Sequence, residues 1–533
     1  MKHFGLGLVI CLSGMGVWFP AGIAGQDPAA AGQQAQLDPY VVGAAAPPLA
    51  EGAEMISMTL EQAIDRALTS NLDIQTIELS PRLQTFALES ARAAFTPTLI
   101  GNYRYNNSTR QSTSQLDGGA RTTNQQHSFN TSLSQTVPWY GGRLSADFNN
   151  SRTSTNNAFT TLNPSYNSSV SLNYTQPLLA GRSTDNQRTT LRSQEIQGQI
   201  VDIQVSSLVW RVTDLVRVQY WNLRAAIEQI EIQRRALAQA QQLLADNQLR
   251  VQLGSMAPIQ VVQAQSQVAA AEQALLNAQV QWRNAELGLK SLLIGGADDP
   301  LLGQTINPSE LPTLAEQAVD IDAALQVALR ERADLRQQRQ ELAISELELD
   351  VAADGRLPSL DLVASYSLQG VGGTLFERSE LGGDPVLVER GGYLDGLNSI
   401  ADFDTPTWSV AMNFSYPIGM RSGRANAERA RLQFEQSQLA IRSQELAIIT
   451  EVTSSGLAVT DTNLQLQAAQ RSRELAEESA LAEITRFNAG AATNFEVGQA
   501  NDDVTSARLA ELRALINHIN AIADFERVQR VGN

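Results

Sequence analysis

The chain has 533 residues, a length that would predict about three to four soluble domains unless the sequence contains repeats. It carries 39 basic and 56 acidic side chains, a net charge of −17 that disfavours nucleic acid as a partner. The only cysteine, Cys11, lies in an N-terminal segment that we expect to be removed, which leaves His127 and His518 as the only histidines. The mature chain would then have no thiolate or His-rich metal site and no cysteine nucleophile. No catalytic motif is found, so we expect no enzyme, no cofactor and no catalytic, cofactor-binding or metal-binding residues.

Residues 1–24 have the pattern of a secretory signal peptide. A basic start precedes an apolar run from Phe4 to Phe19, and small residues follow at Gly22 and Ala24. We expect cleavage after Ala24. The alternative is a membrane anchor, which needs about 20 apolar residues and fits this Gly-containing run poorly. Residues 25–55 are rich in Ala, Pro, Gly and Gln, which predicts a flexible N-terminal linker.

The first half of the remaining chain, residues 56–294, contains helices with strands between them. Helices are predicted at residues 59–95, 186–253 and 257–294. Thr59 and Gln62 fit a capping box at the start of the first helix. Gly254 ends the long second helix, which would span about 100 Å, and Pro258 begins the third.

Residues 97–177 change to a period of two, which predicts β-strands. From Tyr166 to Gln176, for example, aromatic and aliphatic residues alternate with Asn, Ser and Thr. A soluble β-sandwich would alternate in the same way. Segments of about 10 residues with aromatic residues near their ends favour a transmembrane β-barrel instead, and we keep the sandwich as the alternative.

The second half, residues 320–533, repeats this order after a Pro-containing connector at 295–319. It is predicted to hold a helix, strands at 358–417, a long helix at 421–488 and a helix at 492–530. Val170-Ser-Leu-Asn-Tyr-Thr-Gln-Pro177 is similar to Val410-Ala-Met-Asn-Phe-Ser-Tyr-Pro417. The chain therefore reads as two structural repeats, in which one long helix pairs with two shorter ones.

In this order of elements, residues 57–530 resemble the TolC family of outer-membrane channel proteins. The resemblance rests on Leu60-Glu-Gln-Ala-Ile-Asp-Arg-Ala-Leu, Gln176-Pro-Leu-Leu-Ala-Gly181, the Arg-x-x-x-Gly turns at 250 and 486, and Val261-Val-Gln-Ala-Gln-Ser-Gln-Val-Ala-Ala-Ala-Glu. It implies an α+β membrane protein, in which an outer-membrane β-barrel continues into a long periplasmic α-helical coiled-coil barrel. The implied assembly is a homotrimer in outer-membrane lipid that extends into the periplasm of a Gram-negative type envelope.

The resemblance also implies a function and partners. The expected function is the exit duct of a tripartite efflux or type I secretion system, docked to a periplasmic adaptor protein and an inner-membrane transporter. The alternative is a structural or adhesive envelope protein whose helices only span the periplasm. The sequence does not identify the cargo, because the pump mainly selects it.

One feature departs from the family pattern of two strands per half. The first half has an extra pair of predicted strands, around Phe129–Val137 and Leu144–Phe148, joined by Pro138-Trp-Tyr-Gly-Gly142. The strand number of the assembled barrel therefore does not follow from the family.

Two turns between helices are candidate sites for adaptor contact. In the family such turns face the adaptor, which carries this role over to Arg250, Leu253, Gly254, Arg486, Phe487 and Gly490. The same glycines also fit helix caps, which need a positive φ.

The family also has acidic residues after the second turn that narrow the periplasmic end of the tube. The first of these corresponds to Glu496 and the second to Gln499, while the matching position in the first half is Gln260. A trimer would then carry one ring of three carboxylates. The alternative is that Glu496 is an ordinary solvated charge on a helix.

The segment from Val371 to Thr405 holds seven acidic residues and several glycines. This composition predicts a long mobile loop on the extracellular side. No metal site is expected in it, because nothing fixes the carboxylates in a coordination geometry.

Overall fold

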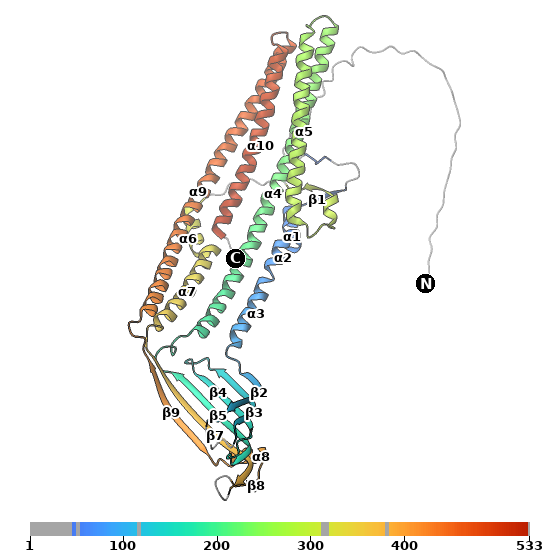
Figure 1. The fold of residues 1–533 in the computed structure, drawn as a ribbon. Helices are drawn as coiled ribbons and strands as arrows, with labels where there is room; N and C mark the ends of the chain where they lie inside the picture. The colour runs from blue at the N-terminus through green and yellow to red at the C-terminus, as the bar shows by residue number, and fades with distance from the viewer. Residues whose placement is uncertain (1–44, 49–53, 114–118, 311–318, 379–382, 531–533) are drawn as a thin grey trace, which may run out of the picture. The chain divides into compact units, whose positions relative to one another are not determined.

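The computed structural model describes residues 45–48, 54–113, 119–310, 319–378 and 383–530. They form a mixed α/β fold rich in helix (Figure 1). The proposed signal peptide, most of the linker and part of the connector lie outside the described residues. Among the helices in these ranges, none combines the length and the apolar character that crossing a membrane requires.

The segment predicted as one helix at 59–95 consists of three helices. α1 (Leu60–Ser70) begins with the predicted capping box between Thr59 and Gln62. It ends at Asn71, whose backbone is extended and whose side chain accepts hydrogen bonds from the N–H groups of residues 73 and 74. Asn71 thereby starts α2 (Leu72–Ile77), and α3 (Ser80–Ala93) follows. An internal N-cap residue explains why the single helix is interrupted.

The long helices are α4 (Asn186–Gln252) and α9 (Arg421–Asn488). α5 (Ile259–Leu293) packs along α4, and α10 (Asn494–Arg530) packs along α9 and α4 (Figure 1). At 1.5 Å per residue, the 67 residues of α4 extend for about 100 Å.

The second half begins with two helices where the sequence predicts one. α6 (Ile321–Glu331) and α7 (Ala333–Asp354) are separated at Arg332, whose backbone is extended. The guanidinium of Arg332 is buried and forms ion pairs with Asp334 at 2.7 Å and with Glu451 of α9 at 2.5 Å. At this break, the buried guanidinium of Arg332 therefore contacts α9.

Seven strands of the described residues form one antiparallel sheet. The strands are β2 (Thr98–Gln111), β3 (Arg121–Thr136), β4 (Arg143–Thr155), β5 (Leu162–Pro177), β7 (Ser359–Glu377), β8 (Val386–Arg390) and β9 (Pro406–Ser415). Their order is β2-β3-β4-β5-β7, with β9 and β8 both paired to β7. The extra strand pair, β3 and β4, thus lies inside the sheet and is continuous with its neighbours.

The register gives the sheet one apolar and one polar face. One cross-strand row of the apolar face contains Leu99, Leu133, Ala146, Leu172, Tyr366 and Trp408. The next row, on the other face, contains Ile100, Ser132, Asp147, Ser171, Ser367 and Thr407. Because side chains alternate along each strand, the six long strands β2, β3, β4, β5, β7 and β9 share the same two faces.

The described part of the connector, residues 295–310 and 319, contains a short helical turn and a strand. After a 3₁₀ turn (Pro300–Gly303), β6 (Thr305–Pro308) pairs in parallel with β1 (Met55–Met58). The buried carboxylate of Glu286 on α5 accepts the N–H of Ile306 and lies 3.3 Å from the ammonium of Lys290. These polar contacts fix the connector to the first helical pair.

The prediction of a mobile loop at 371–405 is wrong for the residues of this acidic segment that the structure describes. β7 continues to Glu377, β8 follows, and α8 (Tyr393–Ala401) packs against β7 and β5. Gly370 and Gly372 allow this packing, since a Cβ on either would collide with the backbone of α8. Composition alone did not reveal that these glycines form a surface on the sheet against which α8 packs.

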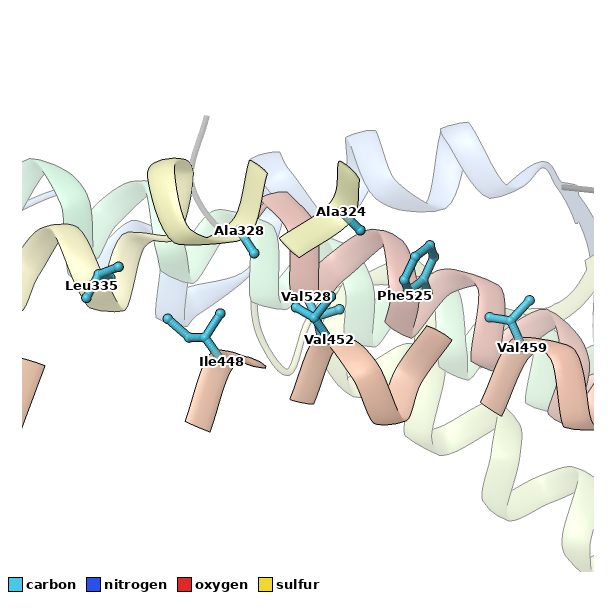
Figure 2. Packing of buried hydrophobic residues seen from close by; sticks show 8 residues of the cluster. All are labelled: Ala324, Ala328, Leu335, Ile448, Val452, Val459, Phe525 and Val528. Carbon is cyan, nitrogen blue, oxygen red and sulfur yellow. The ribbon is translucent and has the colours of Figure 1, made fainter. Parts of the chain in front are cut away.

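A core cluster joins the helices of the second half. Ile448, Val452 and Val459 of α9 pack with Leu335 of α7 and Phe525 of α10, together with Ala324, Ala328 and Val528 (Figure 2). The branched side chains interdigitate with small alanines, which allows α6 to approach α9 closely.

Ile448 and Ile449 offer a matched test of this core. Ile448 is fully buried, whereas Ile449 is 37% exposed. We expect Ile448→Ala to destabilise the protein by about 2–5 kcal/mol, because the substitution removes buried surface and leaves a cavity. Ile449→Ala on the same helix should cost clearly less. Urea unfolding followed by circular dichroism measures both, and equal midpoints for the two variants would contradict the described core.

Candidate functional site

Both long helices end in the same hydrogen-bonded turn. At the end of α4, the N–H of Ser255 donates to the carbonyl of Arg250 at 2.9 Å, and the N–H of Gly254 donates to Val251 at 3.0 Å. Gly254 has φ of +73°. This pattern is a Schellman motif, in which glycine takes the left-handed conformation that other residues adopt at a cost.

The end of α9 repeats the motif. The N–H of Ala491 donates to the carbonyl of Arg486 at 2.8 Å, and the N–H of Gly490 donates to Phe487 at 3.0 Å. Gly490 has φ of +75°. The two sequence-predicted turns thus share one backbone geometry, and their glycines act as caps in both.

The two turns contact each other through side chains. The guanidinium carbon of Arg250 lies 4.2 Å from the ring centroid of Phe487, and its Nη2 donates to Asn488 Oδ1 at 3.4 Å. Phe487 is buried with Leu243 of α4 and Val497 of α10. A cation over an aromatic face is attracted by the ring quadrupole, so Arg250 links the two helical hairpins.

The remaining turn residues are divided between solvent and local contacts. Leu253 is 73% exposed. The guanidinium of Arg486 pairs with Glu483 at 2.6 Å and donates to the carbonyl of Ala491 at 3.4 Å, so it braces its own turn. The exposed surface therefore comes mainly from Leu253 and the apolar neighbours Leu249 and Phe495.

Glu496 forms a capping box at the start of α10. Its Oε2 accepts the N–H of Thr493 at 2.6 Å, and its own N–H donates to Thr493 Oγ1 at 3.3 Å. Hydrogen bonds from the backbone N–H and hydroxyl of Thr493 lower the pKa of the Glu496 carboxyl from its ordinary value. In the single chain, Glu496 is thus a fully exposed helix cap as well as a negative charge.

The two glutamine positions differ from each other. Gln499 is exposed, and its Nε2 donates to Asp503 Oδ1 at 2.9 Å. Gln260 is partly buried, and its Oε1 is inaccessible and without a hydrogen-bond partner. The buried amides of Asn247 and Asn494 also lack partners. Sequence reasoning missed both asparagines, because only packing reveals that they are buried.

A family model described as outer membrane efflux protein matches residues 143–295 and 324–524 of this chain. No curated protein matches the sequence. Among solved structures, the chain is similar to the CmeC outer membrane channel of Campylobacter jejuni, with a TM-score of 0.65 and 16% identity over 89% of this chain and 86% of that one.

Two further channel structures have a similar fold. The outer membrane protein VceC of Vibrio cholerae gives a TM-score of 0.60 and 14% identity over 89% of this chain and 96% of that one. The MtrE outer membrane channel of Neisseria gonorrhoeae, in its open state, gives 0.58 and 17% identity over 88% of each chain. At these identities the likeness concerns the fold.

The capping box at Glu496 predicts a pH-dependent helix start. A carboxylate with a lowered pKa stabilises the cap at pH values above its ordinary pKa, and this contribution is lost as pH falls through the lowered value. Glu496→Gln should keep a capping hydrogen bond but lose the pH dependence. Amide hydrogen exchange of residues 493–497, expressed as protection factors against pH, measures this.

Glu478→Gln is the control, since it removes an exposed carboxylate from α9 at a distance in sequence from the cap. Its protection factors at residues 493–497 should follow those of the wild type. The same pH dependence in Glu496→Gln as in the wild type would show that the carboxylate does not act through its charge.

Proposed function

Because the chain belongs to the outer membrane efflux protein family, we propose that this outer-membrane channel is the homotrimeric exit duct of a tripartite efflux or type I secretion system. An inner-membrane transporter would supply the cargo, a periplasmic adaptor would connect the two, and the duct would conduct passively. The observation that carries the proposal is the sheet, with its two chemically distinct faces and its two unpaired edges.

The faces of the sheet suit a wall between lipid and water. Large apolar side chains on one face, such as Leu99, Leu133 and Trp408, are 44–74% exposed in the single chain. The other face carries small polar residues, where Asp147 accepts hydrogen bonds from Ser132, Ser145 and Asn173. An apolar outer face and a polar inner face are the pattern of a transmembrane β-barrel with an aqueous lumen.

The edges of the sheet support a closed trimer. β2 and β9 lie at its two sides, and their side chains are almost all exposed. Unpaired backbone groups cannot remain in hydrocarbon, so β9 of one copy would pair with β2 of the next. Three copies would then close a barrel of about eighteen strands, a size that leaves an aqueous channel.

The helices would continue the duct through the periplasm. We take the two halves as structural repeats, since each contains a long helix (α4 or α9) that ends in a Schellman turn beside a shorter one (α5 or α10). Three copies would place these helices side by side as a coiled-coil barrel. The turns at Gly254 and Gly490, with exposed Leu253 and with Arg250, Arg486 and Phe487 around them, would then meet the adaptor.

The function is tested by deleting the gene and exposing the strain to drugs, dyes and metals while measuring secreted proteins in parallel. A duct predicts accumulation or sensitivity for at least one cargo class, restored by the wild-type gene. A structural or adhesive envelope protein predicts unchanged sensitivity and secretion, with the defect confined to envelope integrity or attachment.

The extra strand pair provides a test of the membrane barrel. Leu133 and Ser134 are neighbours on β3 with opposite faces, and Leu133 pairs with Leu99. Leu133→Arg should impair assembly, since a cation on the lipid face costs about 2–4 kcal/mol near the bilayer midplane. Ser134→Arg, on the lumen face, is the matched control. Trimer yield in outer-membrane fractions measures the effect, and equal yields for both variants would argue against membrane insertion of β3.

We propose that Glu496 narrows the periplasmic end of the duct, with Gln499 and Gln260 as uncharged neighbours of the ring. Three carboxylates close together in a narrow pore would favour cations. In one chain the capping hydrogen bonds lower the pKa of Glu496. In the ring, repulsion among the three carboxylates would act in the opposite direction, since like charges raise a carboxyl pKa. Glu496→Gln should reduce cation selectivity and block by multivalent cations in planar bilayers, whereas Glu478→Gln should not. Identical reversal potentials and block in wild type and Glu496→Gln would remove Glu496 from the constriction.

A further inference from the structure

A pocket lies at the turn between β3 and β4, where the extra strand pair meets the start of α4. It has a volume of about 500 Å³. We call it the turn pocket. The lining residues that matter for its chemistry are Trp139, Tyr140, Leu178, Leu179, Arg182 and Leu357. They come from three separate segments, namely the β3–β4 turn, the β5–α4 loop and the α7–β7 loop.

The turn pocket combines an exposed apolar surface with the cation of Arg182. A second arginine of its lining, Arg188, is paired with Asp185 at 2.5 Å. Trp139 is 66% exposed, Tyr140 59% and Leu357 47%. The guanidinium carbon of Arg182 lies 5.7 Å from the ring centroid of Tyr140. None of the ion pairs that the described residues form involves Arg182, so its charge is available to a ligand.

The walls of the pocket are held in place by polar contacts. The carbonyl of Tyr140 accepts Gln176 Nε2 at 2.7 Å, which ties the turn to β5. Gly141 packs so closely on the β5–α4 loop that a Cβ would lie 2.6 Å from the carbonyl oxygen of Gly181. The N–H of Gly181 in turn donates to Asp354 Oδ2 at 2.5 Å. The aromatic side chains are therefore presented from a fixed backbone.

The strand register relates the pocket to the apolar face of the sheet. The turn follows the last β3–β4 pair, Thr136 with Arg143. One row further into the sheet, Gln135 pairs with Leu144, and Leu144 pairs with Tyr174 on the apolar face. The pocket lies where this face ends and the helical part begins. In the proposed channel, this level is the boundary between hydrocarbon and the periplasm, where Trp and Tyr side chains are favoured.

We propose that the turn pocket binds a glycerophospholipid of the periplasmic leaflet, with its phosphate at Arg182 and an acyl chain against Leu178, Leu179 and Leu357. The guanidinium supplies a charge-assisted hydrogen-bond donor for a phosphate oxygen. Trp139 and Tyr140 lie at the level of the headgroup and glycerol. The inference rests on the proposed function, because the pocket meets this leaflet only if the sheet spans the outer membrane.

Native mass spectrometry of the delipidated protein, titrated with palmitoyl-oleoyl phosphatidylglycerol, tests the site. We expect saturable binding that Arg182→Gln weakens by about tenfold, the effect of losing one hydrogen bond to a charged group. Arg442→Gln, which removes an exposed arginine from α9, is the matched control and should bind as the wild type does. The diacylglycerol with the same chains, which lacks the phosphate, should bind weakly.

Tyr140→Asn separates lipid binding from turn formation. Tyr140 has φ of +58°, a conformation that asparagine tolerates better than tyrosine does, so the turn should persist without the ring. Weaker lipid binding at normal trimer yield supports the site. Equal binding by the Arg182 and Arg442 variants, or equal binding of diacylglycerol, would overturn it. Trimer mass and bilayer conductance, recorded on the same samples, report separately on the proposed channel.

Discussion

A sheet of six long strands with two unpaired edges is the constraint on which our account of this protein depends. Backbone N–H and C=O groups at an edge must find partners, and in hydrocarbon only another strand can provide them. β2 and β9 meet this condition only if they pair between copies. In the proposed channel, the closed barrel and its lumen follow from that pairing.

The extra hairpin adds two strands to the sheet and keeps one face apolar and the other polar. β3 and β4 contribute to both the apolar and the polar rows, so the added strands widen the sheet and leave its two faces intact. Their connecting turn brings Trp139 and Tyr140 to the level where sheet and helices meet. A departure from the family pattern therefore adds both width and an interfacial aromatic surface.

The contacts near the helix ends serve two purposes. The Schellman turns at Gly254 and Gly490 terminate the helices, while Arg250 joins the two turns through Phe487 and Asn488. The capping box uses the same carboxylate, Glu496, that we place at the constriction. A change at this end of the protein therefore acts on helix stability and on the surface of the proposed pore together.

Local signals in the sequence account for much of the fold. The capping box at Thr59 and the glycines at helix ends are visible because they are local, and the strands are visible because one face is apolar. The sequence did not reveal the helix breaks at Asn71 and Arg332. At Asn71 the side chain caps the next helix, and at Arg332 the side chain pairs with α9, which is distant in the sequence. The packing of α8 on Gly370 depends on a contact between α8 and β7, which the sequence of neither element predicts by itself. Cap geometry for Gly254 and Gly490 was predictable, whereas the link from Arg250 to Phe487 was not.

The most direct measurement is disulfide cross-linking between the two edges of the sheet in outer-membrane vesicles. Cys11 is the only native cysteine, so engineered pairs have little background. Chains that carry Ile100→Cys on β2 together with Ser409→Cys, Ala411→Cys or Asn413→Cys on β9 place both thiols on the polar face. Within one sheet these edges are separated by four strands, too far for a disulfide. Our account predicts that at least one pair yields covalent trimers on non-reducing gels. Monomers alone from every pair would contradict closure of the barrel between copies.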